Sequence, residues 1–186
     1  MSKKLNCIFS GKFEYQKGAD VFLDLVDSFK EEMNWTVAAI ANGSDSSLLK
    51  QIPPYVKVYM DLSNESVLKI LSQADILIFP SRTEGFGIAV LEAMSKCVVP
   101  IVLNIPIGIP DQVFHGYNGF IVSAENWEEA GIYLRKLDSD NSLLIEMKRN
   151  ALCFVRNNFD SISIADYFVN QVNNAIVCDE KRFNKQ

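Results

Sequence analysis

The sequence predicts an α/β protein with a doubly wound parallel sheet of about six strands, flanked by helices. Short apolar runs, rich in β-branched and aromatic residues, alternate along the chain with segments of helical period. Several of these runs are apolar throughout, which is typical of parallel strands that are buried on both faces. Loops that carry glycines follow two of the predicted strands, and such sheets bind their ligands in loops of this kind.

The predicted strands are short, and helices separate them. The strands lie at residues 5–10, 35–41, 56–60, 76–79, 98–103 and 119–123. The helices lie at residues 19–32, 64–73, 88–96, 126–137, 142–157 and 161–174, with one short helical turn after the loop 104–110. Ser63 is the expected N-cap of its helix, because its hydroxyl can accept a bond from an unpaired helix amide. We expect a single domain over residues 1–186, with extra helices at its C-terminal end.

Composition narrows the classes of function. The chain has 186 residues, 48% hydrophobic residues and a net charge of −5, which disfavours a nucleic-acid binder because such proteins usually carry a basic surface. Its four cysteines stand apart and its single histidine, His115, is expected to be exposed and structural, so no metal centre is predicted. No apolar run reaches the length of about 18 residues that a membrane span needs. Because the first residues also lack a secretory signal, we expect a cytoplasmic protein.

The loop at residues 11–18 joins the first predicted strand to the first helix. Gly11 lets the chain leave the strand sharply, and Gly18 opens the helix so that backbone amides can approach an anion. Lys12 and Lys17 add positive charge, so the loop suits a diphosphate. Its spacing matches neither G-x-G-x-x-G nor G-x-x-x-x-G-K-[ST]. Taken alone, the two lysines fit a solvated basic loop better.

The loop at residues 81–87 and the helix after it carry two glutamates. Glu92 lies among apolar neighbours, and burying its carboxylate costs free energy unless hydrogen-bond donors reach it. Two adjacent hydroxyls of a sugar or ribose would match its two oxygens. The alternative is that Glu84 caps the helix and Glu92 pairs with Lys96 on an exposed face.

Four segments resemble, in order and spacing, the retaining glycosyltransferases of family 4. The segment from Glu84 to Glu92 looks like their E-x7-E motif, and Gly11 to Gly18 resembles their G-R-x(4)-K-G loop. Residues 73–81 are similar to their strand ADIFVFPS, and residues 111–120 to their E-x(4)-G-x-N-G-F stretch. The resemblance covers about residues 6–175. It implies that the chain is the C-terminal, donor-binding half of a GT-B fold, a Rossmann-like domain whose N-terminal acceptor domain is absent.

The resemblance also implies a role for each site residue. Lys17 would contact the donor diphosphate, with Lys12 beside it where the family usually has arginine. Glu84 would hold hydroxyls of the transferred sugar, and Glu92 the nucleotide ribose. The backbone amides that would face sugar and phosphate belong to Gly85, Phe86, Gly87 and Ile88. Lysine at position 12 is a departure from the family, because an ammonium lacks the bidentate fork of a guanidinium. Asp111 stands where a glutamate is more usual, and we give it no role.

The implied activity is transfer of a hexosyl group from a UDP-sugar or GDP-sugar, with retention, to a glycan or lipid-linked acceptor. The resemblance implies no metal and no cofactor, since Lys12, Lys17 and a helix N-terminus can stabilise the departing diphosphate. Acceptor binding would need an N-terminal domain in cis or in trans, so the isolated chain is expected to be inactive. Any peripheral contact with the inner face of the cell membrane would be made through that missing half.

Other interpretations remain open from the sequence. The chain could be a non-catalytic module that binds nucleotide or docks a partner, derived from a split or degenerate glycosyltransferase. An epimerase of GT-B type is disfavoured by the single histidine, and a receiver domain by the absence of an acidic cluster after the first strand. For Arg82 we expect a surface or interdomain contact. For the aromatic residues Phe13, Tyr15 and Phe86 we expect packing in preference to stacking on a base.

Overall fold

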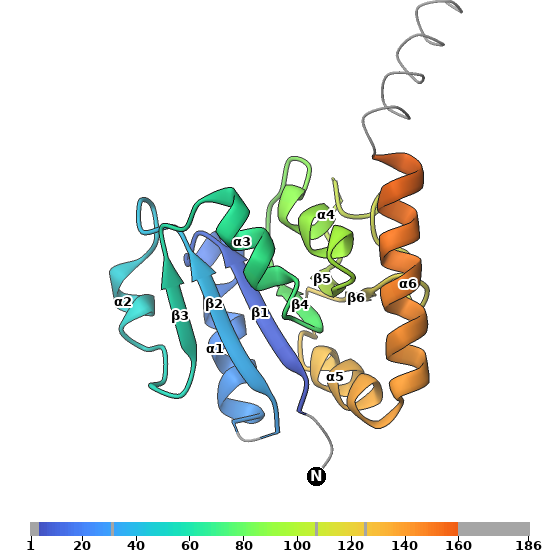
Figure 1. Cartoon of the computed structure of the whole chain (residues 1–186). Coiled ribbons are helices and arrows are strands. Elements are labelled where there is room, and N and C mark those ends of the chain that lie inside the picture. The colour runs from blue at the N-terminus through green and yellow to red at the C-terminus, as the bar shows by residue number, and fades with distance from the viewer. Residues whose placement is uncertain (1–3, 31, 107, 125, 160–186) are drawn as a thin grey trace, which may run out of the picture. The chain divides into compact units, whose positions relative to one another are not determined.

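The computed structural model describes residues 4–30, 32–106, 108–124 and 126–159, and a six-stranded parallel sheet runs through its centre (Figure 1). The strand order is β3-β2-β1-β4-β5-β6, and every neighbouring pair is parallel. The strands are β1 (Asn6–Gly11), β2 (Asn34–Ala39), β3 (Lys57–Met60), β4 (Ile76–Phe79), β5 (Val99–Leu103) and β6 (Phe120–Val122). The predicted fold class is therefore confirmed, and each predicted strand is present.

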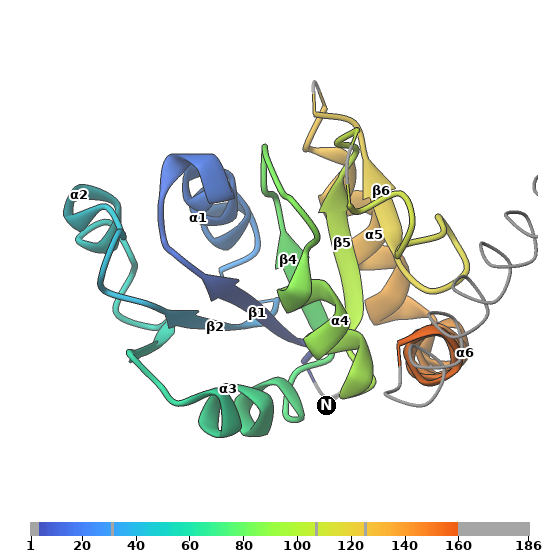
Figure 2. The same cartoon turned by 90° about the horizontal axis from the view of Figure 1, so that it is seen from above.

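Helices cover both faces of this sheet. They are η1 (Tyr15–Lys17, a single 3-10 turn), α1 (Ala19–Ser28), α2 (Ser46–Leu49), α3 (Asn64–Leu71), α4 (Ile88–Ser95), α5 (Glu129–Ser139) and α6 (Asn141–Asn158). Figure 2 shows α1 and α5 on one face of the sheet and α3 and α4 on the other. Residues up to Leu152 form one compact unit, and a second unit begins at Cys153. The predicted helix at residues 161–174 lies outside the described residues.

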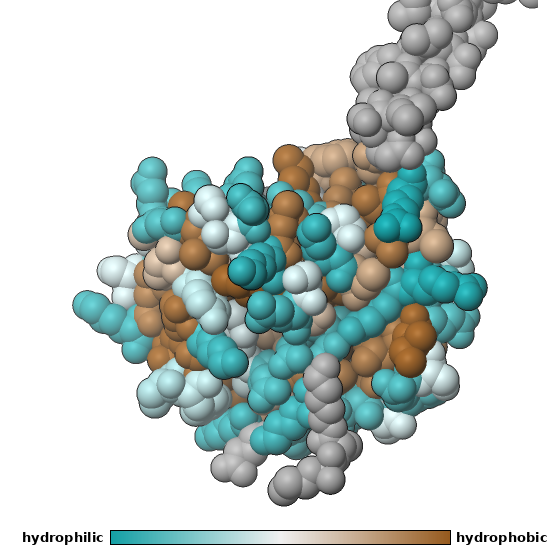
Figure 3. Space-filling view, in the orientation of Figure 1, coloured by the Kyte–Doolittle hydropathy of each residue, from teal (hydrophilic) through white to brown (hydrophobic). Residues whose placement is uncertain are grey.

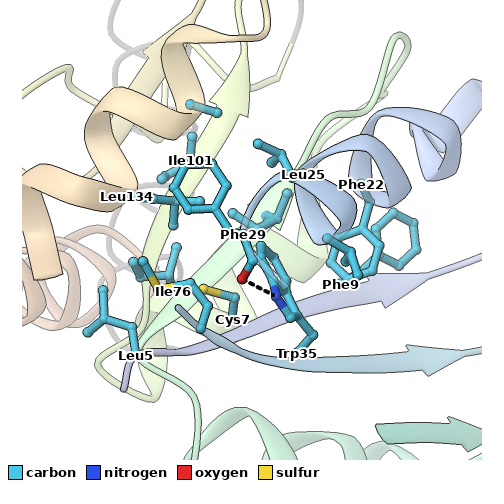
Figure 4. Close-up of a cluster of buried hydrophobic side chains, with 14 of the residues drawn as sticks. Leu5, Cys7, Phe9, Phe22, Leu25, Phe29, Trp35, Ile76, Ile101 and Leu134 are labelled. Atoms are coloured by element: carbon cyan, nitrogen blue, oxygen red, sulfur yellow. Dashed lines mark hydrogen bonds between the residues drawn. The ribbon is translucent and has the colours of Figure 1, made fainter. Parts of the chain in front are cut away.

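The main core lies between the sheet and the helices α1 and α5, which cover one of its faces (Figure 4). Cys7 and Phe9 of β1 point into this core, whereas Ile8 between them is buried but not part of it, as expected for a strand with helices on both sides. The rings of Phe9 and Phe22 lie 5.4 Å apart, and those of Phe22 and Trp35 lie 5.6 Å apart. Aromatic packing of this kind anchors α1 to the sheet.

The first helix is shorter than predicted, and the core explains why. The prediction extended it to residue 32, but α1 ends at Ser28. The carbonyl of Phe29 accepts a bond from the indole of Trp35 at 3.4 Å and another from the amide of Glu32 at 3.1 Å (Figure 4). The chain therefore turns at Phe29, which lets both this ring and Met33 be buried.

Two short elements were missed, and one predicted cap is confirmed. Neither η1 nor the four-residue α2 was expected; α2 depends on Asp45, whose carboxylate accepts the amide of Ser47 at 2.7 Å. The hydroxyl of Ser63 accepts the amide of Ser66 at 3.3 Å, so Ser63 is the N-cap that the sequence predicted. Short helices lack the periodic apolar face on which sequence prediction depends.

The strand order identifies where a ligand would bind. From β1 the sheet grows to one side through β2 and β3 and to the other through β4, β5 and β6. In doubly wound sheets, ligands bind beyond the carboxyl ends of the two strands where the winding reverses, which here are β1 and β4.

Figure 3 shows apolar and polar side chains interleaved over the visible face, with apolar side chains reaching the upper edge. Among the described residues, no helix has the length and apolar character to cross a membrane.

Candidate donor-binding site

The loop after β1 closes tightly against the end of β4. Gly11 has a φ of 133° and Gly18 a φ of 73°, both of which favour glycine. A Cβ on Gly18 would stand 2.2 Å from the carbonyl oxygen of Pro80, so no other residue fits there without moving the backbone. The two glycines therefore let η1 and the start of α1 lie beside the strand end, as the sequence predicted for a loop that approaches a ligand.

The loop after β4 leads into α4 through Gly87. This glycine is the N-cap, with a φ of 74° and no side-chain capping bond. Ser81 is buried at the end of the strand, and its hydroxyl bonds the carbonyl of Thr83 at 2.9 Å and Oε1 of Glu84 at 3.1 Å. Ser81 therefore fixes the direction in which Glu84 leaves the loop.

Lys17 and Glu84 meet between the two loops. Nζ of Lys17 lies 2.5 Å from Oε1 of Glu84, and their side chains are 28% and 13% exposed. Both line a cavity of about 260 Å³ at the carboxyl ends of β1 and β4. The other lining residues are Ser10, Gly11, Phe79, Phe86, Gly87, Ile88 and Ala89. The structure therefore brings together Gly11, Lys17, Glu84, Phe86, Gly87 and Ile88 of the predicted site.

Glu92 lies one turn into α4 and does not line this cavity. Its side chain has no hydrogen bond or ion pair within the described part of the chain, and the alternative pairing with Lys96 does not form there. Partial burial raises the pKa of Glu92 above its ordinary value. A half-buried carboxylate without donors fits a residue whose partners come from a ligand.

The side chain of Lys12 lies beside Gly43. It is exposed, and a Cβ added to Gly43 would stand 3.1 Å from both its Cε and its Nζ. It does not line the cavity, and neither do Gly18 and Gly85. The two lysines of this loop therefore have different neighbours, Gly43 for Lys12 and Glu84 for Lys17.

The aromatic residues divide between core and surface. Phe13 is fully buried, with its ring 5.1 Å from Phe9 and 6.2 Å from Phe22, so packing is its role, as expected. Phe86 is half exposed at the cavity. His115 is exposed and its Nδ1 accepts the amide of Ile121 at 3.2 Å, which confirms the structural role predicted for it.

A larger hollow lies elsewhere, between α1 and α5. It has a volume of about 660 Å³, and its lining includes Phe29, Trp127 and Arg135. None of the predicted site residues reaches it. Because it lies away from the carboxyl ends of β1 and β4, we assign the candidate site to the smaller cavity.

Comparison with known proteins identifies the family. The family model for group 1 glycosyl transferases matches residues 2–152. The chain belongs to this family. A mannosyltransferase of Xanthomonas oryzae, named for GDP-mannose and cellobiosyl-diphosphopolyprenol, is 26% identical over 180 residues, which are 91% of this chain and 47% of the relative. The match covers less than half the length of this relative and of a 41.2 kDa protein from the cps region of Klebsiella pneumoniae, which is 26% identical over 168 residues.

Solved structures agree with this glycosyltransferase fold. HepE of Anabaena, crystallised with UDP and glucose, superposes with a TM-score of 0.80 at 18% identity, covering 92% of this chain and 48% of HepE. The C-terminal domain of a group 1 glycosyltransferase from Francisella tularensis superposes with a TM-score of 0.73 at 19% identity and covers 87% of this chain. That domain is itself covered to 89%, so its length and fold match this chain.

Two residues around the site of this glycosyltransferase chain were not recognised from the sequence. Gln112 is fully buried, and its side-chain amide donates to the backbone carbonyl of Phe86. Its backbone carbonyl accepts the side-chain amide of Asn118 at 3.0 Å. Arg82, expected at the surface or between domains, is held within the chain by Asp20. Asn118 belongs to a motif that the resemblance covers, but nothing in the sequence marks which loop it supports.

Proposed function

We propose that this chain is the donor-binding half of a GT-B glycosyltransferase and binds a nucleoside-diphosphate sugar beside Lys17 and Glu84. The observation that carries the proposal is the position of Lys17 and Glu84, which line one cavity at the carboxyl ends of β1 and β4. A cation for phosphate and a carboxylate for sugar hydroxyls are the groups that such a donor requires. Residues 1–186 then act as one functional half, and transfer with retention takes place in the cleft with the N-terminal half.

In this proposal, donor binding separates the Lys17–Glu84 pair. Lys17 turns to the diphosphate, and Glu84, still held by Ser81, accepts hydroxyls of the sugar. The amides of Ile88 and Ala89 start α4 beside the cavity, and the helix dipole favours negative charge there. Lys17 and these amides together stabilise the leaving diphosphate, so the reaction needs no metal ion. Glu92 receives the ribose hydroxyls, which would supply the donors that its carboxylate lacks.

For the donor nucleotide we propose UDP, with GDP as the alternative. The likeness to HepE, which was crystallised with UDP and glucose, supports UDP. The name of the Xanthomonas relative supports GDP-mannose, and also supports a lipid-linked glycan as the acceptor. With such an acceptor the enzyme works in the cytoplasm at the inner face of the membrane, which it contacts through the other half.

Nucleotide binding tests the proposal on this chain alone. We expect UDP to raise the melting temperature and to bind measurably by calorimetry, and Lys17→Met to weaken that binding by about tenfold or more, because a charge-assisted bond is lost. Lys69→Met, an exposed lysine on α3, is the control and should change nothing. If neither UDP nor GDP binds at millimolar concentration, the proposed function is wrong.

Catalysis is tested separately, by mixing the chain with the N-terminal half of a related full-length enzyme and a UDP-sugar. Sugar transfer that depends on Glu84 would support the enzyme. Nucleotide binding without transfer in every such mixture would favour the alternative, a binding module that derives from a glycosyltransferase.

A further inference from the structure

Arg82 connects the two loops that carry Lys17 and Glu84. Its guanidinium donates to both carboxylate oxygens of Asp20, from Nη1 to Oδ1 and from Nη2 to Oδ2, each at 2.8 Å. Nη1 also donates to the carbonyl of Tyr15 at 2.5 Å. Arg82 lies two residues before Glu84, and Tyr15 lies two residues before Lys17. The side chain of Arg82, on the loop at residues 81–87, therefore bonds the loop at residues 11–18 and the start of α1, close to the residues that form the ion pair.

The contacts around Arg82 extend beyond its charge. The guanidinium carbon lies 3.9 Å from the centroid of the Tyr15 ring, within the range of a cation–π interaction. The backbone amide of Arg82 donates to the carbonyl of Gln16 at 2.9 Å. Burial acts to raise the pKa of Asp20, but the hydrogen bonds and the charge of Arg82 outweigh it, and the pKa lies below its ordinary value. Asp20 is therefore ionised at neutral pH, and the pair keeps both charges.

We propose that Arg82 is a positioning residue of the donor site, which fixes the loop at residues 11–18 against the loop at residues 81–87 and so sets where Lys17 stands. Lysine at this position would keep the charge but could not bond two carboxylate oxygens and a carbonyl in one plane. The consequence for nucleotide binding rests on the proposed function. The connection between the loops is a property of the protein without nucleotide.

The first experiment measures UDP affinity by calorimetry for Arg82→Lys and for a matched control, Arg135→Lys. Arg135 on α5 makes the same two kinds of contact, an ion pair with Glu32 at 2.8 Å and a cation–π contact with Phe29 at 4.7 Å. We expect Arg82→Lys to weaken UDP binding by about tenfold, because displaced binding groups lose much of their effect. The control should change it less than about twofold. Equal effects of the two substitutions would overturn the proposal.

A second background shows whether Arg82 acts through Lys17. If it does, Arg82→Lys causes no further loss of UDP affinity in a chain that already carries Lys17→Met. If Arg82→Lys weakens UDP binding by the same factor with and without Lys17→Met, Arg82 acts on the nucleotide by another route. That result would overturn the positioning role. Asp20→Asn keeps the side-chain shape and should weaken UDP binding in the same direction by a smaller factor, so a poorly folded Arg82→Lys chain would not prevent the test.

A third measurement needs no nucleotide. The amide of Gly18 donates to the carbonyl of Tyr15 at 3.0 Å, and the amide of Arg82 bonds the same loop. We expect their hydrogen exchange to accelerate by about tenfold in Arg82→Lys and to stay unchanged in Arg135→Lys. Unchanged protection in Arg82→Lys would overturn the proposal whether or not UDP binds. Accelerated exchange in a chain that binds neither UDP nor GDP would refute the proposed function and leave the connection between the loops supported.

Discussion

Two lysine–carboxylate pairs lie at opposite ends of β1 and β4, and they look alike. At the carboxyl ends, Lys17 and Glu84 are 2.5 Å apart, with side chains 28% and 13% exposed. At the amino ends, Lys148 of α6 and Asp75 are also 2.5 Å apart, with side chains 23% and 11% exposed. Neither distance nor burial distinguishes the pair in the candidate site from the other pair.

The surroundings of the two carboxylates differ. Oδ2 of Asp75 accepts both the backbone amide of Asn6 at 2.9 Å and its side-chain amide at 3.1 Å, so both oxygens of Asp75 are bonded within the protein. Glu84 receives Lys17 and Ser81 on Oε1, and no bond to its Oε2 is found among the described residues. Glu84 lines the cavity of about 260 Å³ at the carboxyl ends of β1 and β4, and Asp75 does not. A carboxylate oxygen that lies beside a cavity and has no hydrogen bond within the described residues therefore marks a ligand site, and the ion pair itself does not.

The largest effect is expected at the amino ends of the strands. Lys148→Met should lower the free energy of unfolding by about 2 kcal/mol, because it leaves the carboxylate of Asp75 largely buried without its cation. UDP affinity of the folded chain should stay the same. Urea denaturation measures the first quantity and calorimetry the second. A stability loss below about 0.5 kcal/mol, typical of surface pairs, would show that the two pairs do not differ as described.

The next effect is expected at Glu84, and its sign depends on the ligand. Glu84→Gln releases Lys17, so UDP alone should bind about threefold more tightly. The variant cannot offer a charged acceptor to sugar hydroxyls, so UDP-glucose should lose about tenfold in affinity relative to UDP. Competition calorimetry of the two ligands measures this ratio. Parallel changes in both affinities would mean that Glu84 does not contact the sugar.

The fold could be predicted from the sequence where a segment is apolar and long enough. Strands β4 and β5 are fully buried, and the apolar runs in the sequence predicted the bounds of both strands to within one residue. The end of α1 could not be predicted, because it depends on a bond from Trp35, whose strand lies beyond the helix. The four residues of α2 carry no periodic signal.

The site could be predicted in part, for a similar reason. Lys17 and Glu84 were proposed because the motifs around them resemble a known family. The contact of Arg82 with Asp20 was not predicted, because the two residues are 62 positions apart along the chain and no local pattern marks the pair. Lys12 was proposed for the same reason as Lys17 and Glu84, and its role at the phosphate stays a prediction. The sequence did not predict that its side chain lies along Gly43.

A smaller effect is expected at Glu92, where stability and binding should move in opposite directions. Because burial raises the pKa of Glu92 above 4.5, the folded state holds its proton more tightly than the unfolded state, and the ionised carboxylate costs stability at neutral pH. Glu92→Gln should therefore raise the melting temperature by about 2 °C at pH 7.5. This gain should vanish as the pH falls through the raised pKa toward 4.5. The same substitution should weaken UDP binding by about threefold, because a neutral acceptor replaces a charged one. A gain that persists at pH 4 would show that burial of the charge is not its cause.

The smallest effect is expected at Lys12, which the family resemblance places at the phosphate and the structure places against Gly43. An exposed ammonium that does not line the cavity acts on a diphosphate only through solvent and is screened by salt. Lys12→Met should therefore weaken UDP binding by less than about twofold at 0.15 M salt, and by less still at higher salt. Lys17→Met is the matched comparison, since both lysines lie in the loop at residues 11–18. Calorimetry at two salt concentrations separates them. Equal losses would mean that Lys12 turns to the nucleotide on binding. In that case, the position of a lysine in the cavity before binding would not decide which lysine binds phosphate.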